Sequence, residues 1–205
     1  MPEKLNETDL ARLYSPPSER IQQAVMPELL SFHEQYLAKA TFFCLATGRD
    51  AGLDASPRGG PPGFVKVLDS KTIAFADWPG NNRIESMRNL TQDNRIGMLF
   101  IFPGLEVFMR INGHGYISDN RDLCSRLAEG DKIAKSAIVV TIDEVLFHCG
   151  KALNRAKLWQ AESQLNAKSL PTPGQIMAAM TRQDASVAKA VDEQYQHAVR
   201  NDLYG

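Results

Sequence analysis

Short apolar runs rich in β-branched and aromatic residues recur through the middle of the chain, and turn-forming residues separate them. This pattern is typical of strands. Residues 63–69 and 72–77 are close enough in the chain to form a hairpin. The predicted strands cover residues 40–47, 63–69, 72–77, 95–102, 107–118 and 136–143, and residues 144–150 continue or follow the last of them.

Helical patterns lie before, between and after these strands. Ser18 can cap a helix that carries apolar residues from Ile21 to Phe32, and Pro27 should break or kink that helix. Asn82 is a candidate cap for a short helix that follows it. The remaining predicted helices cover residues 83–93, 119–130 and 151–159, with one or two more over 175–199.

The order of these elements favours one fold class. Strands fill the centre, helices lie at both ends, and few crossover helices separate the strands. This arrangement predicts a mainly β (α+β) antiparallel barrel with peripheral N- and C-terminal helices, rather than a doubly wound sheet. We expect a single domain over residues 1–205, with an N-terminal helical segment at 1–38, the barrel at 40–160 and C-terminal helices at 174–205.

Composition narrows the class of protein. The 205 residues are 43% hydrophobic and 23% charged, which is ordinary for a globular domain. A formal net charge of -1 gives no sign of a broad nucleic-acid surface, and no apolar run approaches the ~20 residues of a membrane helix. Three widely spaced cysteines without a CxxC motif support neither a disulfide framework nor a zinc site. The polar start MPEKLNETDL does not resemble a signal peptide, so we expect a cytoplasmic protein.

An arginine lies within the turn-forming stretch Ser56-Pro57-Arg58-Gly59-Gly60. Proline fixes one backbone torsion, and glycine permits a close approach of the backbone to a ligand. The guanidinium offers a planar fork of donors that suits phosphate, or a face that stacks on a ring. From the residues alone, a solvated loop arginine is the competing interpretation.

A second arginine, Arg83, follows Gly80-Asn81-Asn82 at the expected start of a short helix. A helix N-terminus presents unpaired amides and the positive end of the dipole, which favours an anion. An arginine in the first turn opposes the dipole, and a bound phosphate would explain its presence. The alternative is that Asn82 caps the helix and Arg83 is solvated.

Two further polar clusters occur near the end of the predicted barrel. Arg110 and Asn112 share one face of a strand, and that face can equally be the solvent side. Residues 147–159 are dense in Lys and Arg, with an aromatic residue at each end. His148 and Cys149 are adjacent on a predicted strand and so point to opposite faces, which argues against a Cys–His dyad. The histidines have no metal-ligand spacing.

In this order, the segments ATFFCLAT, DASPRGGPPGFVKVLD, GNNRIESMRNL, RIGMLFIFPG, MRINGHGYI and FHCGKALNRAKLW resemble the pyridoxamine 5'-phosphate oxidase-related family of FMN-binding split barrels. The resemblance extends from about Ser18 to Tyr204 and is closest to an uncharacterised branch. It implies a six-stranded antiparallel split barrel that forms a homodimer, with FMN at the subunit interface.

The resemblance also implies a role for each cluster of residues. Asn82 and Arg83 would hold the FMN phosphate, and Ser56, Pro57 and Arg58 would line the ribityl chain or the edge of the ring. The other predicted cofactor residues are Phe75, Asp77 and Trp78 along the flavin, Arg110 and Asn112 from the partner subunit, and Lys151, Arg155 and Trp159 near the ring.

The chain departs from the family pattern in places. Gly60 stands where the branch commonly has an acidic residue, and the arginine and histidine set that grips pyridoxine phosphate is not recognisable in residues 147–159. The resemblance therefore implies a flavin-dependent oxidoreductase that acts on an unknown small molecule. A flavin- or haem-binding carrier or sensor is the alternative, with His114 or His148 as a haem ligand, and a catalytically silent barrel is a third.

Overall fold

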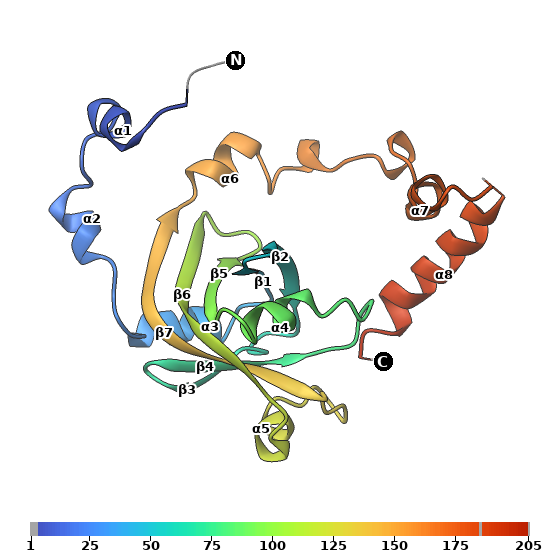
Figure 1. Ribbon diagram of the computed structural model, residues 1–205, viewed down its shortest axis with the longest axis horizontal. Helices are drawn as coiled ribbons and strands as arrows, with labels where there is room; N and C mark the ends of the chain where they lie inside the picture. Colours follow the sequence, from blue (N-terminus) through green and yellow to red (C-terminus); the bar gives the residue numbers. More distant parts are fainter. Residues whose placement is uncertain (1–3, 185, 205) are drawn as a thin grey trace.

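The structure is a computed structural model that describes residues 4–184 and 186–204, and its centre is a seven-stranded antiparallel sheet (Figure 1). The strands are β1 (Phe42–Arg49), β2 (Gly52–Gly59), β3 (Lys66–Asp69), β4 (Thr72–Asp77), β5 (Arg95–Ile101), β6 (Val107–Ser118) and β7 (Ser136–Cys149). They pair in the order β2-β1-β5-β6-β7-β4-β3, so β2 and β3 are the edges. The prediction of an antiparallel α+β fold is confirmed.

Helices surround this sheet and extend beyond it on two sides (Figure 1). The predicted terminal segments include residues 1–3, 185 and 205, which lie outside the described residues. No helix in the described ranges is long and apolar enough to cross a membrane. The helices are α1 (Glu7–Leu13), α2 (Glu19–Gln23), α3 (Ser31–Leu37), α4 (Glu85–Leu90), α5 (Arg121–Arg126), α6 (Lys151–Ala156), α7 (Pro173–Thr181) and α8 (Val187–Asn201), with short 3-10 turns at Ala161–Ser163 and Ala167–Ser169.

The N-terminal segment differs in part from the sequence prediction. Ser18 does precede a helix, and the chain does leave the helix before Pro27, where the backbone of Met26 pairs with Val145. Helix α1 lies within the predicted N-terminal helical segment, but it was not predicted as a separate helix. Its signal was a capping box, in which Asn6 and Asp9 each accept a hydrogen bond from the other's backbone N–H at 3.1 Å.

The stretch that was predicted to be a loop around Arg58 is the edge strand β2. It pairs with β1 along its whole length, and Pro57 lies opposite Cys44. Proline has no N–H to donate, so an edge strand is where a sheet tolerates it. The proline and glycines concealed this strand in the sequence, which is why six strands were expected. The sheet has seven.

The concave side of the sheet is filled by aromatic and branched side chains. Phe43 is fully buried, and its ring centroid lies 5.7 Å from that of Phe64, 5.0 Å from Phe75 and 4.9 Å from Phe100. Burial of each such ring contributes about 1.5–3 kcal/mol. These contacts join β4 to the neighbouring strands β1 and β5, from which β6 and β7 separate it in the sheet order, and so they close the sheet around its core.

Packing explains the glycine at position 60, where the family branch commonly has an acidic residue. A Cβ added there would lie 2.7 Å from both the Cβ and the Cγ of Phe64, closer than real contacts allow. Phe64 stacks on Phe43 and cannot move without disturbing the core. Close packing against Phe64 therefore accounts for a glycine at position 60.

Replacing Gly60 with alanine should destabilise the fold. Forcing an extra methyl group into a packed core typically costs about 1–3 kcal/mol, and we expect a loss of that size in the free energy of unfolding measured by urea denaturation. Gly80→Ala is the matched control, because nothing lies within 4 Å of a Cβ at position 80. Equal stability of the two variants would contradict this explanation of Gly60.

Candidate functional site

A cavity of about 290 Å³ lies where β2 approaches β4 beside the start of α4. It is lined by side chains from two of the clusters that the sequence singled out, although these clusters are separated by about twenty residues in the chain. Of the predicted site residues, the cavity brings together Ser56, Arg58, Asp77, Trp78, Asn82 and Arg83, and Asp54 and Ser86 also line it.

Arg58 crosses the gap between the two strands. Its Nη2 donates to Ser86 Oγ (3.2 Å) and lies 3.9 Å from Asp77 Oδ1. Its Nε is buried and has no hydrogen-bond partner among the described residues. A buried donor without an acceptor costs about 1–3 kcal/mol, so an acceptor brought by a ligand would relieve this cost.

Hydrogen bonds between two serine hydroxyl groups and a carboxylate fix side chains that line the cavity. Buried Ser86 donates to Asp54 Oδ2 at 2.6 Å, and its oxygen also lies 3.0 Å from Ser56 Oγ. Because the single Ser86 proton is used on Asp54, Ser56 must be the donor in the second contact. Asp54 and Ser86 were not predicted from the sequence to belong to the site. The alternation of β2 could have identified Asp54, which shares a face with Ser56 and Arg58.

Asp77 provides the carboxylate nearest to Arg58. Burial raises the pKa of Asp77 above its ordinary value, and the positive charge of Arg58 opposes that shift. Asp77 ends β4, directly beyond the core residue Phe75 on the same face of the strand. The cavity thus lies next to the apolar core on the inner face of the barrel, and its lining is polar.

The turn that carries Arg83 is strained. The described residues include four non-glycine residues with positive φ, and two of them, Asn82 (φ 58°) and Ile84 (φ 46°), flank Arg83. A β-branched residue rarely adopts this conformation, which costs on the order of 1–3 kcal/mol. Such strain is concentrated at ligand-binding sites in proteins.

Two predictions about this turn are wrong. Helix α4 begins at Glu85 with Ile84 at its N-cap position, so Asn82 does not cap it and Arg83 precedes its first turn. The reason is the Asn81 side chain, which accepts the backbone N–H of Arg83 (3.1 Å) and holds the chain in a turn. Within the described residues the exposed guanidinium of Arg83 has no hydrogen bond or ion pair to protein groups.

Other predicted site residues lie outside this cavity. Pro57 faces outward from β2 and Phe75 is fully buried in the core. Arg110 and Asn112 both donate to Glu144 Oε1, at 2.9 and 2.8 Å, across β6 and β7.

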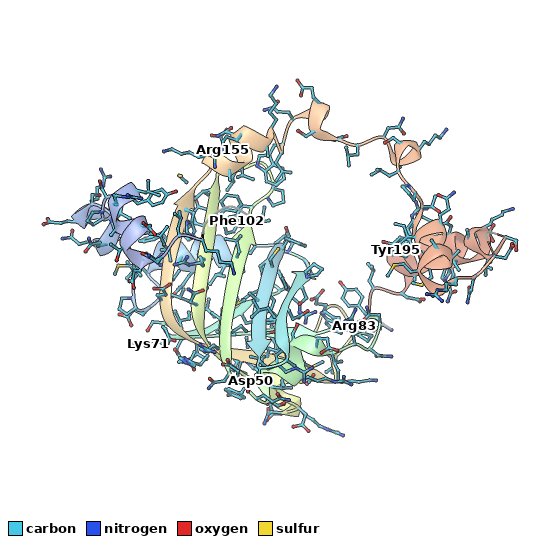
Figure 2. All side chains as sticks on the ribbon, turned by 45° about the horizontal axis from the view of Figure 1, so that its top comes forward. Asp50, Lys71, Arg83, Phe102, Arg155 and Tyr195 are labelled. Atoms are coloured by element: carbon cyan, nitrogen blue, oxygen red, sulfur yellow. The ribbon has the colours of Figure 1, made fainter. Side chains whose placement is uncertain are left out.

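Lys151 and Arg155 lie on α6, and Trp159 Nε1 donates to the Leu105 carbonyl at 3.0 Å. Figure 2 shows Arg155 and Arg83 on opposite sides of the barrel. One chain therefore does not bring these two clusters together.

Neither candidate haem ligand lines the cavity. His114 is exposed, with Nδ1 2.8 Å from Asp143 Oδ2. His148 lies on β7, where burial and then the nearby Arg110 lower its pKa. Across residues 4–184 and 186–204, no three His, Cys, Asp or Glu side chains are grouped so that they could hold a metal ion.

A scan of the chain against family profiles matches pyridoxamine 5'-phosphate oxidase over residues 29–149, more than half of the chain. The chain belongs to the pyridoxamine 5'-phosphate oxidase family. The matched segment includes every strand and all the residues that line the cavity. A comparison with curated proteins finds no match.

Several solved structures are similar to this member of the family. A variant of HupZ from group A Streptococcus is 14% identical, with 58% of this chain and 100% of that chain covered and a TM-score of 0.49. A putative pyridoxamine 5'-phosphate oxidase from Listeria innocua is 10% identical (57% and 94% covered, TM-score 0.44). The FAD binding protein from Mycobacterium smegmatis is also 10% identical (60% and 97% covered, TM-score 0.41).

Proposed function

We propose that the cavity between β2 and β4 binds the polar part of FMN and that this family member is a flavin-dependent oxidoreductase acting on a small molecule. The observation that carries the proposal is a pair of arginines in one cavity, each with donor groups that make no hydrogen bond to a protein group among the described residues. Arg58 has a buried Nε without a partner, and Arg83 has a guanidinium without one among the described residues.

The groups that line the cavity fit the chemistry of FMN. Arg83 would bind the phosphate, because the strained turn holds it beside the cavity and guanidinium groups bind phosphate oxygens strongly. Ser56, Arg58 and Asp77 provide both donors and an acceptor, which suits the hydroxyl groups of a ribityl chain. The volume of about 290 Å³ lies at the small end of ligand sites, about 300–1,000 Å³, so the cavity suits this polar part better than the whole cofactor.

A bound flavin would supply the redox chemistry, as cofactors generally do. The contribution of this chain would be to anchor the phosphate through Arg83 and to orient the adjoining chain through Ser56 and Arg58. The haem alternative has no support in the cavity, because neither His114 nor His148 lines it.

We further propose that two copies of the chain share each site. Arg155 lies across the barrel from Arg83, so the two could meet at one flavin only if they came from different copies (Figure 2). The outer face of β1, β5 and β6 suits such a contact. Cys44, Leu99 and Arg110 are aligned across it, beside a second row of Ala46, Gly97 and Asn112.

Arg110 supports the same interface. Its Nε is buried and has no partner among the described residues, although the side chain already donates to Glu144. An acceptor on a second copy or on its flavin would satisfy this group. The homodimer and the shared site thus rest on the same outward-facing residues.

Arg83→Met should weaken FMN binding by about 10–100-fold, the effect of losing a hydrogen bond to a charged group worth about 1.5–3 kcal/mol. Riboflavin has no phosphate, so its affinity should change little. Fluorescence titration with both ligands measures the difference. Arg88→Met is the matched control, since Arg88 is an exposed arginine on the neighbouring helix and does not line the cavity. Equal losses for FMN and riboflavin would contradict the assignment of Arg83 to the phosphate.

Mixing two defective variants tests the shared site. If Arg83 of one copy and Arg155 of the other serve the same flavin, Arg83→Met and Arg155→Met should each bind FMN weakly as homodimers. A heterodimer of the two variants would keep one intact site, so an equimolar refolded mixture should regain tight binding at about one quarter of its sites. Absence of any recovery, with heterodimers demonstrated by mass spectrometry, would rule out sharing between copies.

A further inference from the structure

The C-terminal tail, residues 161–204, returns to the barrel at Tyr204. Helices α7 and α8 pack on each other, and the Gly174 N–H donates to Asp192 Oδ1 at 2.7 Å. Figure 1 shows this pair of helices standing away from the sheet, with the end of the chain coming back beside the segment that follows β4. Within the described residues, Tyr204 makes the hydrogen bond that joins this tail to the barrel.

One carboxylate holds two aromatic side chains at this point. Glu129 Oε1 accepts from Trp78 Nε1 (2.9 Å), and Oε2 accepts from the Tyr204 hydroxyl (2.7 Å). The two rings meet edge to face, with centroids 4.8 Å apart and planes at 82°. Hydrogen bonds to a charged acceptor are stronger than neutral ones, and the aromatic contact adds to them.

Glu129 itself is fixed by its backbone. Its N–H and carbonyl each form a 3.1 Å hydrogen bond with Lys132, across a turn in which Gly130 adopts a φ of 63°. The hydrogen bond to Glu129 and partial burial raise the pKa of Tyr204 above its ordinary value. The residue to which the tail attaches therefore has its backbone held in a hydrogen-bonded turn.

Trp78 connects this point of attachment to the candidate flavin site. It lines the cavity together with Arg58 and Arg83, and it packs against the small apolar cluster that contains Leu127. A tail attached through Tyr204 thus touches a residue of the cavity wall. If the tail is released, Trp78 loses its aromatic neighbour.

We propose that Tyr204, Glu129 and Trp78 form a latch that fastens the C-terminal tail at the rim of the cavity and thereby slows the release of the ligand bound there. The attachment of the tail follows from the contacts of Tyr204 with Glu129 and Trp78, and the effect on the flavin rests on the proposed function. Tyr204 is a positioning residue in this scheme, because it acts through Trp78. A segment held at so few points opens by local fluctuation, so the latch would control an opening rate.

The first experiment uses the chain without flavin. Tyr204→Phe keeps the ring and removes the hydrogen bond to Glu129, and it should speed tryptic cleavage of the tail after Lys189 and Arg200 by about tenfold. Tyr195→Phe is the matched control, because Tyr195 is an exposed tyrosine of the same tail. In a Trp159→Phe background, which leaves Trp78 as the only tryptophan, Tyr204→Phe should also change the Trp78 emission.

The second experiment measures dissociation of FMN from the loaded chain after dilution. Tyr204→Phe should release FMN about 5–10-fold faster than the parent chain, and Tyr195→Phe at the parental rate. Unchanged cleavage and unchanged Trp78 emission in Tyr204→Phe would overturn the latch. Faster cleavage with unchanged FMN release would overturn its link to the cavity. If the parent chain binds no FMN, the proposed function fails, and cleavage and emission alone decide whether the latch exists.

Discussion

Arg58 joins two strands that have no backbone hydrogen bonds to each other. Strand β2 pairs with β1 only, and β4 pairs with β3 and β7, yet the guanidinium of Arg58 lies 3.2 Å from Ser86 Oγ and 3.9 Å from Asp77. On one side of this contact the barrel is filled by Phe43 and Phe75, and on the other side it opens into a polar cavity. Ser86 belongs to the same network, which therefore also contacts the start of α4 just after the strained turn at Arg83. The cavity exists because polar side chains, and not packed apolar ones, join β2 to β4 here.

The strands and the fold class could be predicted from the sequence because apolar runs and turns are local signals. Strand β2 could not, since Pro57 and the glycines after it are also the residues of a loop, and only pairing with β1 distinguishes the two. In the site, the sequence identified Arg58 and Arg83 but placed Phe75 with them. Phe75 and Asp77 share a face of β4. Packing by other strands buries Phe75 in the core and leaves Asp77 at the cavity, and the sequence of β4 alone does not show where along this face the core ends.

Long-range contacts account for the rest of what the sequence did not predict. Nothing in the local sequence distinguishes the hydroxyl of Ser86 or the carboxylate of Glu129 from other polar groups. Only the fold places Arg58 beside the first and Tyr204 beside the second. Arg110 and the α6 residues lie far from the cavity of their own chain, and a single sequence does not distinguish contacts within one copy from contacts between two. The proposed dimer would explain the distance of Arg110 and α6 from the cavity, and the proposed latch gives a role to the contact between Glu129 and Tyr204.

The proposed function requires that the chain bind a flavin that can be reduced. The most direct measurement is the visible spectrum of the chain after incubation with FMN and gel filtration, followed by anaerobic addition of NADH or NADPH and then of air. We predict that the flavin absorbance elutes with the protein, bleaches on addition of the nicotinamide and returns in air. Elution of all the FMN as free cofactor, at protein concentrations that favour the dimer, would contradict the assignment of this cavity to a flavin.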